Sequence, residues 1–379
     1  MAEPRKIVLV IGNGFDLDLG LETSYKNFWE SEYCPKDYPA PLIKHLNQRW
    51  KDELDAVKWY DLENELWNYY ITITDKNNGV DIFTEEEIKL LKIFTRYEYA
   101  CGFYNDKQKV IESLINKGAL KLKSGPNGTI DDHYKPDCLH SPIWRDKQAL
   151  ILIKKGLCDY LNSLFHSKAK ETIAFQVLNC LNQEAENGIS VNIYTFNYTP
   201  VRLNDSDLEH AKVHYMHGNS KDGKIILGTR DSVEYSQSYD FLQKSFDPYY
   251  NPPSLVAELQ EADEVIIFGH SLGINDQQYF KAFFMQQTNY TNPNHKDITI
   301  FTKDDSSQIQ IKRALQDITN GNLSTLFGLN NVTFIKTGNI KEDQHLLLSF
   351  LTKHGKHIIS TKEFIGHLLS KEILNGIKA

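Results

Sequence analysis

Four short polar stretches of the chain carry the residue types that bind nucleotides or transfer protons. They are GNGFD at 12–16, TFNYT at 195–199, HGN at 217–219 and GHSLG at 269–273. Each stretch follows an apolar run of the kind that forms a buried strand of a parallel sheet. Because ligands of an open parallel sheet bind at the carboxyl ends of its strands, we expect the four stretches to converge on one crevice.

The first stretch is typical of a turn that approaches a phosphate. The apolar run 7–11 precedes Gly12-Asn13-Gly14, which predicts a strand, a glycine turn with exposed backbone N–H groups and a helix capped by Asp16 or Asp18. The third glycine of the dinucleotide fingerprint would fall at Leu17, so a standard Rossmann dehydrogenase is not expected. Asp16 would repel a pyrophosphate but could hydrogen-bond a ribose hydroxyl. A tight turn that requires glycine geometry without a ligand is the other interpretation.

Asn197 and His217 are the residues that could orient or deprotonate a small reactant. Asn197 precedes Pro200 closely, a place where asparagine commonly forms a turn by bonding its own backbone. His217 ends the alternating strand VHYMHG, and its unperturbed pKa near neutrality suits a general base. A structural histidine is the alternative there.

The stretch 269–273 also matches the G-x-S-x-G motif of serine hydrolases, with Asp304 or Asp305 and then His345 further along the chain. The hydrolase motif needs a helix that begins at the serine, whereas Asn275 or Asp276 is the natural helix cap here. We therefore favour a second ligand-binding turn, and a serine hydrolase that uses Ser271 remains an alternative.

The sequence predicts no metal site. His133, Cys138 and His140 lie close together but lack a partner pair of zinc ligands. Asp61 and Glu63, two residues apart on a predicted helix, do not face each other, which indicates a solvated helix face. A less favoured alternative is a nucleotidase or nuclease in which Asp16 and Asp276 jointly hold a metal.

The elements that position these stretches predict an α/β fold. Apolar runs alternate with helical patterns, which favours parallel strands joined by crossovers; the runs after the first lie at 191–196, 212–216, 224–227, 264–268, 297–301 and 331–335. Residues 45–188 show helical periodicity, with 120–142 interpreted as a loop. We predict a Rossmann-like core of residues 1–44 and 189–379, a mostly parallel sheet flanked by helices. A large all-helical insertion, residues 45–188, follows the first β-α unit.

Composition restricts the class of protein further. The 379 residues are 41% hydrophobic and 24% charged, as in ordinary globular proteins. A net charge of −8 argues against a surface that wraps nucleic acid, and no apolar span is long enough for a membrane helix. Five widely spaced cysteines without a C-x-x-C motif, and a chain that enters a core strand by residue 7, indicate a cytoplasmic protein with reduced thiols. The oligomeric state stays open, a homo-oligomer included.

Together the motifs resemble the AbiH family of bacteriophage abortive-infection proteins. The matching segments are IGNGFD at 11–16, LETSYKNF at 21–28, WYDLE at 59–63, FNYT at 196–199, HGN at 217–219 and GHSLGINDQQYF at 269–280. The resemblance extends from residue 7 to about residue 284. It implies a role in phage defence, with a phage protein as a trigger.

The AbiH family is in turn distantly similar to the sirtuin-like fold, a Rossmann-type sheet that binds NAD. This similarity implies that Asn197 orients the nicotinamide ribose or a water and that His217 is the base on a ribose hydroxyl. It also implies an NAD-binding set in which glycines approach the pyrophosphate and Gly269 with Ser271 holds a ribose or phosphate. That set is Gly12, Asn13, Gly14, Phe15, Asp16, Thr195, Gly269, His270, Ser271 and Asp276. The implied activity is hydrolysis of the nicotinamide glycosidic bond of NAD, without a metal.

Three positions depart from the sirtuin pattern. Asn13 replaces a small residue, Asp16 stands where serine is common, and Thr199 stands where many sirtuin-like proteins carry aspartate. The chain also lacks the cysteine quartet of deacylating sirtuins, so lysine deacylation is not expected. A non-catalytic protein that binds a nucleotide or senses a phage component is the remaining alternative.

Overall fold

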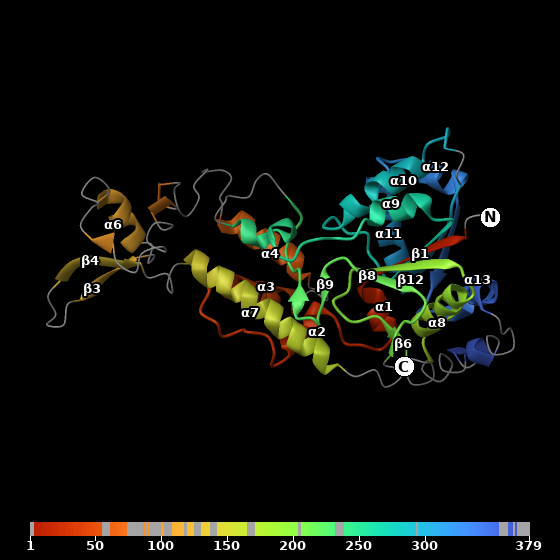
Figure 1. Cartoon of the computed structure of the whole chain (residues 1–379), viewed down its shortest axis with the longest axis horizontal. Coiled ribbons are helices and arrows are strands. Elements are labelled where there is room, and N and C mark those ends of the chain that lie inside the picture. Colours follow the sequence, from red (N-terminus) through yellow and green to blue (C-terminus); the bar gives the residue numbers. More distant parts are fainter. Residues whose placement is uncertain are drawn as a thin grey trace. The chain divides into compact units, whose positions relative to one another are not determined.

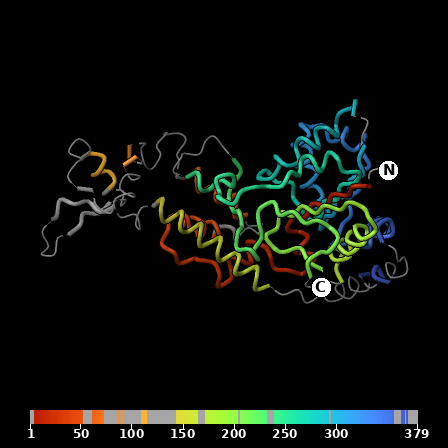
Figure 2. The backbone as a smooth tube through the Cα atoms, in the orientation of Figure 1, coloured from red at the N-terminus to blue at the C-terminus, as the bar shows by residue number. Residues whose placement is uncertain are grey.

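The computed structural model contains two compact units, and the chain passes between them at four places (Figures 1 and 2). The first unit comprises residues 1–27, 158–225 and 249–379, and the second comprises 28–157 and 226–248. Residues 158–188, which the sequence analysis assigned to the insertion, thus belong to the first unit. The structure describes residues 4–54, 61–73, 86–87, 89–90, 100–101, 108–116, 120–124, 130–136, 142–164, 171–203, 206–231, 239–292, 295–355, 363–366 and 368–369.

A parallel sheet of six described strands forms the centre of the first unit. The strands are β1 (Lys6–Ile11), β5 (Ser190–Thr195), β8 (Lys212–Tyr215), β11 (Glu264–Phe268), β12 (Asp297–Thr302) and β13 (Asn331–Lys336). Their spatial order is β13-β12-β11-β1-β5-β8, and every neighbouring pair is parallel. Numbered along the chain, this is the doubly wound order 3-2-1-4-5-6, which reverses between β1 and β11. The predicted α/β fold with a parallel sheet is confirmed.

Helices cover both faces of this sheet because its strands are apolar on both sides. In β1, Ile7, Leu9 and Ile11 belong to one hydrophobic cluster, and Val8 and Val10 belong to another. The first cluster includes residues of two helices, α8 (Ile173–Glu186) and α13 (Ile340–His354). The helices of the second cluster lie on the opposite face (Figure 1): α9 (Leu255–Glu261), α10 (Lys281–Gln287), α11 (Asp305–Ile318) and α12 (Leu323–Leu329).

One predicted strand lies outside the main sheet. The run 224–227 supplies only β10 (Lys224–Ile225), which pairs antiparallel with β9 (Gly218–Asn219). The sequence pattern at 276–287 predicts one helix, but the structure divides this segment into a short 3₁₀ turn, η5 (Gln277–Tyr279), and α10. Both differences shorten the regular elements next to the carboxyl edge of the sheet and leave loops there.

The second unit is mainly helical and also contains a small antiparallel sheet. Its helices include α3 (Pro41–Leu54), α4 (Leu62–Ile73), α6 (Gln108–Asn116) and the part of α7 (Pro142–Ser163) up to residue 157. The strands β2 (Ala100–Cys101), β3 (Leu120–Ser124) and β4 (Ile130–Pro136) pair in the order β2-β4-β3. The prediction of an insertion without strands was therefore wrong at 100–101, 120–124 and 130–136. β3 (LKLKS) alternates leucine and lysine over only five residues and β4 (IDDHYKP) is mostly polar, so neither has the continuous apolar run that marks a buried strand.

The WYDLE motif takes part in an internal polar network of the second unit. Glu63 and Lys244 are buried and form an ion pair of 3.0 Å, and Glu65 pairs with Arg49 at 2.9 Å. Asp61 accepts a hydrogen bond from the backbone N–H of Asn64 (3.2 Å) and so caps the start of α4. The prediction of a solvated helix face was wrong for Glu63.

Several sequence predictions fall outside the described residues. The capping-box patterns at 84–87 and 360–363 each predict the start of a helix, but Thr84, Glu85 and residues 360–362 are not described. The same holds for Trp59 and Tyr60 of the WYDLE motif and for the side chains of His133, Cys138 and His140.

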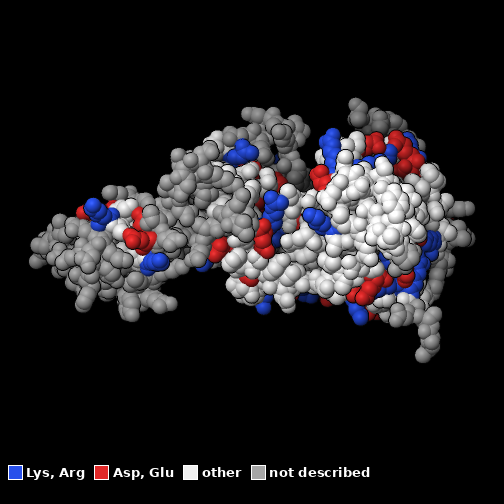
Figure 3. Space-filling model, turned by 90° about the horizontal axis from the view of Figure 1, so that it is seen from above, with Lys and Arg blue, Asp and Glu red and all other residues white. Residues whose placement is uncertain are grey.

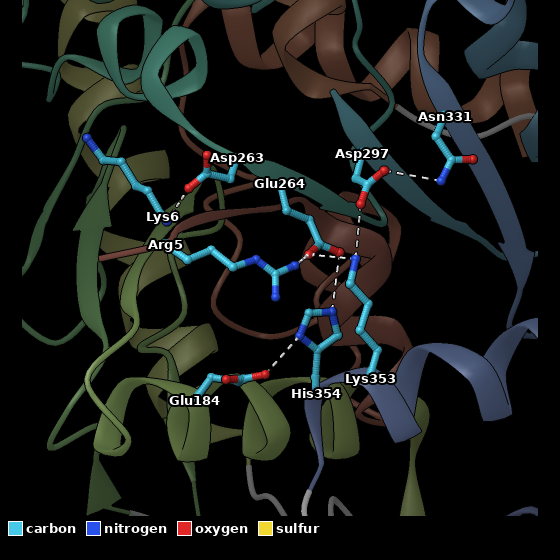
Figure 4. A network of polar contacts seen from close by, with 9 residues as sticks. All are labelled: Arg5, Lys6, Glu184, Asp263, Glu264, Asp297, Asn331, Lys353 and His354. Carbon is cyan, nitrogen blue, oxygen red and sulfur yellow. Dashed lines mark hydrogen bonds and ion pairs between the residues drawn. The ribbon is translucent and has the colours of Figure 1, made fainter. Parts of the chain in front are cut away.

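The amino edge of the main sheet holds a charged network around Glu264 (Figure 4). This carboxylate is 1% exposed and contacts Arg5, Lys353 (2.9 Å) and His354 Nε2 (3.2 Å). Burial acts to raise the pKa of Glu264, but His354 and Lys353 outweigh it and hold the pKa below its usual value. The other ring nitrogen of His354 lies 3.3 Å from Glu184 of α8. The network thus joins the end of α13 to the sheet and to α8.

In the view of Figure 3 the described surface carries no large area of a single charge sign. Lys and Arg alternate there with Asp and Glu around a wide area of other residues. The formal net charge of −8 agrees with this distribution. No described helix combines the length and the apolar character needed to cross a membrane.

Candidate functional site

The structure brings the four polar stretches together at the carboxyl edge of the main sheet. They follow β1, β5, β8 and β11, which are neighbours in the sheet. The registers pair Ile11 with both Phe268 and Thr195, and Thr195 with Tyr215, so the strands end at similar levels. The stretches lie on both sides of the point between β1 and β11 where the strand order reverses, which is where doubly wound sheets bind ligands.

The Asp276 carboxylate lies between two buried histidines of this edge. Its Oδ1 is 3.1 Å from Nε2 of His217, and its Oδ2 is 3.6 Å from Nε2 of His270. His217 and His270 are 2% and 4% exposed, whereas the Asp276 side chain is 18% exposed. The carboxylate is therefore the member of this group that is most open to solvent.

The hydrogen bonds indicate which ring nitrogens carry protons. Nδ1 of His270 accepts the backbone N–H of Leu272 at 3.0 Å, so a neutral His270 carries its proton on Nε2. At His217, Nε2 must be the donor because a carboxylate only accepts. Base chemistry at His217 would therefore use Nδ1, with Asp276 stabilising the imidazolium that forms.

Aromatic rings surround the two histidines. The ring centre of Phe196 lies 4.3 Å from that of His270 and 5.4 Å from that of His217. Tyr279 packs 6.3 Å from His217, and its hydroxyl lies 2.9 Å from that of Tyr250. Burial raises the pKa of Tyr279, so this phenol stays protonated. Apolar walls strengthen the hydrogen bond between Asp276 and His217 because they lower the local dielectric constant.

Asp16 forms a second buried polar group at the same edge. It is 4% exposed, and Thr199 Oγ1 donates to its carboxylate at 2.5 Å. Burial raises the pKa of Asp16 to about 6, although hydrogen bonds from the Thr199 and Asn197 side chains act to lower it. Two of the three departures from the sirtuin pattern, Asp16 and Thr199, are thus in direct contact.

The first helix begins earlier than predicted. α1 (Asn13–Asp18) has Gly12 as its N-cap, so Asp16 lies within the helix and the prediction that Asp16 or Asp18 caps it was wrong. Asp18 instead accepts the backbone N–H of Ala174 at 2.7 Å, in the first turn of α8. Its burial raises its pKa to about 6.

The glycines of the two turns allow the backbone at β1 to approach the backbone at β11. The N–H of Gly12 donates to the Phe268 carbonyl at 3.0 Å, and the N–H of Gly14 donates to the Gly269 carbonyl at 2.9 Å. A Cβ on Gly14 would lie 2.7 Å from Cα of Gly269, which itself has φ +63°. The prediction that this turn exposes its N–H groups to a phosphate was therefore wrong for Gly12 and Gly14. Close packing accounts for their identity.

The remaining residues of the predicted NAD-binding set have different exposures. Phe15 is 2% exposed and packs edge-on against Phe268 at 5.2 Å, inside the core. Thr195 is fully buried, and its hydroxyl accepts the N–H of Asn197 at 3.1 Å. Asn13 is half-buried and bonds Thr23 at 2.6 Å, whereas Ser271 is exposed. Phe15 and Thr195 therefore support the site from within.

The loop from Gly269 to Asp276 separates β11 from the next helix, as predicted. Leu272 in this loop is fully buried with φ +53°, a conformation unfavourable for a side chain that the core holds in place. The serine-hydrolase residues have other contacts. Asp304 caps α11 through the N–H of Ser307 (2.8 Å), Asp305 pairs with Lys336 (3.0 Å), and His345 is exposed on α13.

Sequence reasoning placed Asp276 and His270 in the NAD-binding set but did not find that Asp276 bonds His217. The sequence gives no signal for the contact between Asp276 and His217. The short spacing between His270 and Asp276 indicates only that these two residues share one loop. Within the described part of the chain, no cluster of three or more His, Cys, Asp or Glu side chains is arranged to hold a metal ion.

The sequence model of the family "Bacteriophage abortive infection AbiH" matches residues 8–296, which include the whole carboxyl-edge site. None of the curated proteins matches the chain. The chain belongs to the AbiH family.

Proposed function

We propose that this AbiH protein is an NAD glycohydrolase, an effector of phage defence that hydrolyses the bond between nicotinamide and ribose. The observation that carries the proposal is the Asp276 carboxylate held between His217 and His270 at the carboxyl edge. A carboxylate that fixes the orientation of an imidazole prepares that ring for proton transfer. Membership of an abortive-infection family supports an activity that harms the infected cell.

The position of the site supports a nucleotide as the substrate. Asn197 and His217 follow β5 and β8, and His270 and Asp276 follow β11, so polar groups approach the point of strand reversal from both sides. Dinucleotides bind at this point of doubly wound sheets. We place NAD, or a closely related nucleotide, in the crevice outside these strand ends.

The proposed reaction uses one water. Its oxygen forms a bond to C1′ of the nicotinamide ribose while the C1′–N bond breaks and its electron pair leaves with nicotinamide. The proton of the water goes to Nδ1 of His217, and the products are nicotinamide and ADP-ribose. Asn197 would hold the water in line, and a positioned base of this kind accelerates a reaction by about 10²–10⁴-fold.

Contacts to the phosphates would come from groups other than the N–H groups of Gly12 and Gly14, which are used within the protein. Ser271 is exposed in the loop after β11 and offers a hydroxyl, and half-buried Asn13 lies on the β1 side. We assign these two residues to the phosphates or the riboses. The proposal requires no metal.

The burial of the proposed catalytic side chains favours a second candidate function. His217 is 2% exposed and Asn197 is 7% exposed, so the described conformation is closed around them. A non-catalytic protein that binds a nucleotide and senses a phage component would have such a site. A phage protein is the proposed trigger in both candidates.

Nicotinamide release from NAD by the purified full chain tests the proposal. The set comprises the parent, His217→Ala, Asn197→Ala and the control His345→Ala, which changes an exposed histidine of α13. We expect release by the parent and the control, and rates lower by about 100-fold or more in the two site variants. Equal rates in the parent and both site variants would refute the mechanism.

Two further outcomes would identify the alternatives. The sensor is favoured if NAD raises the Tm of the parent without nicotinamide release and Asp276→Ala abolishes this rise in Tm. Labelling by a fluorophosphonate that Ser271→Ala abolishes favours a serine hydrolase.

A further inference from the structure

The side chain of Asn197 is held on one side by two hydrogen-bond acceptors. Its amide nitrogen donates to the Gly12 carbonyl at 3.0 Å. The same side chain also hydrogen-bonds the Asp16 carboxylate. Asn197 is 7% exposed, and its backbone N–H donates to Thr195. The side chain is therefore fixed between α1 and the end of β5.

These contacts determine which end of the amide points away from α1. A carbonyl oxygen and a carboxylate only accept, so both must be met by the N–H₂ group of Asn197. That group has two hydrogens, one for each acceptor. The carbonyl oxygen Oδ1 is then directed away from these two acceptors.

Asp16 is suited to hold this orientation because the Thr199 hydroxyl also donates to its carboxylate. The Thr199 hydroxyl donates to Oδ2 of Asp16 at 2.5 Å, and the neighbours that bond Asp16 are this hydroxyl and the Asn197 amide, both uncharged. With a pKa of about 6, Asp16 is ionised at pH 7.5 and accepts from both. A hydroxyl and a carboxylate at these two positions thus act as a unit.

We propose that Asp16, together with Thr199, is a positioning residue that fixes the Asn197 amide so that its carbonyl oxygen faces the substrate. In this orientation Asn197 accepts a hydrogen bond from a water or a ribose hydroxyl and does not donate one. The attacking water then has one proton directed to Asn197 and the other to His217. Asp16 acts through Asn197 and does not touch the substrate. The inference rests on the proposed function for the identity of the substrate, but the orientation of the amide is measurable without it.

The test compares Asp16→Asn and Thr199→Val with the control Thr319→Val in the full chain. Thr319 is a fully buried threonine whose hydroxyl donates to the Leu315 carbonyl at 2.7 Å, at the end of α11. Selective ¹⁵N labelling of asparagine gives the side-chain amide signal of Asn197, assigned by its absence in Asn197→Ala. Solvent exchange of this amide and the kcat and KM for NAD are then measured.

We expect slow amide exchange in the parent and in Thr319→Val. In Asp16→Asn and Thr199→Val we expect exchange at least 10-fold faster and kcat at least 10-fold lower, with KM changed by less than 3-fold. Fast exchange of the Asn197 amide in the parent would overturn the proposal. So would faster exchange in the variants with an unchanged kcat.

Separate outcomes distinguish the orientation of Asn197 from the glycohydrolase activity. Slow solvent exchange of the Asn197 amide in the parent and faster exchange in both variants, without nicotinamide release from NAD, would support the orientation of Asn197 and refute the glycohydrolase. Nicotinamide release together with an Asn197 amide exchange rate that neither substitution changes would support the glycohydrolase and overturn the role of Asp16.

Discussion

Replacement of Asp276 by asparagine should disable His217 as the proposed base while keeping the shape of the side chain at position 276. An asparagine keeps the shape of aspartate but presents one acceptor and one donor group. His270 must keep its proton on Nε2 because Nδ1 accepts the N–H of Leu272 at 3.0 Å. In Asp276→Asn the oxygen of the introduced amide would therefore turn to His270, and its N–H₂ group would face His217.

This arrangement reverses the tautomer of His217. Nε2 of His217, now 3.1 Å from the Asp276 carboxylate, would have to accept from the new amide, which moves its proton to Nδ1. Nδ1 could then no longer take the proton of the water. We expect kcat to fall by about 10²–10⁴-fold, the contribution of a general base, with KM for NAD changed by less than about 3-fold.

Two measurements check this prediction. Nicotinamide release gives kcat and KM for the parent, for Asp276→Asn and for the control Asp317→Asn, which changes an exposed aspartate of α11. Nitrogen chemical shifts of the histidine rings give the tautomer of His217 in the same proteins. An Asp276→Asn protein that hydrolyses NAD at the parental rate would refute the reasoning. A large loss of kcat with an unchanged His217 tautomer would refute the assigned cause.

Three further predictions concern stability. Gly269→Ala should lower the free energy of unfolding by about 3 kcal/mol, because its Cβ would lie 2.4 Å from backbone atoms of Gly14 and Phe15 at φ +63°. Gly223→Ala, at φ +65° with open space around it, should cost only about 1 kcal/mol, and equal costs in urea unfolding would argue against close packing of the two turns. Asp16 has a folded pKa of about 6, above its ordinary value of 3.8, so the folded state binds its proton more tightly and the parent should lose about 2 kcal/mol relative to Asp16→Asn as pH rises from 4 to 7. A difference between these two proteins that stays constant over this range would contradict the raised pKa. Glu264→Gln removes the carboxylate at Nε2 of the fully buried His354 ring and should destabilise the chain by about 3 kcal/mol. NAD hydrolysis per folded molecule should stay the same because Glu264 lies at the amino edge, and loss of activity in the folded variant would contradict that separation.

The main sheet could be predicted because its strands are buried on both faces. Runs such as those of β1 and β11 are continuously apolar, and the helical patterns between them imply parallel crossovers. The strands β3 and β4 were missed because their sequences, LKLKS and IDDHYKP, contain no such run. Helices α12 and α13 were also not predicted. α12 has only seven residues, and α13 carries charged residues in its first turn and its last turn.

The convergence of the polar stretches followed from topology, but their contacts did not. Asp276 and His217 are 59 residues apart, and their contact depends on a loop that turns at Leu272 with φ +53°. A leucine gives no sequence signal for that conformation, which the core imposes. The glycine turn shows the same limit, since G-x-G is equally consistent with a phosphate and with another backbone at close range. The structure favours the backbone for Gly12 and Gly14.

The central claim is that the carboxyl-edge site destroys NAD when phage infection triggers the protein. The most direct test measures NAD in infected cells that express the parent, His217→Ala or the control His345→Ala at matched levels. We expect NAD to fall after infection of cells that express the parent or His345→Ala, while nicotinamide and ADP-ribose rise. With His217→Ala, NAD should stay at the level of cells without the protein. Protection against phage by the parent with NAD unchanged, or equal loss of NAD with His217→Ala, would contradict the claim.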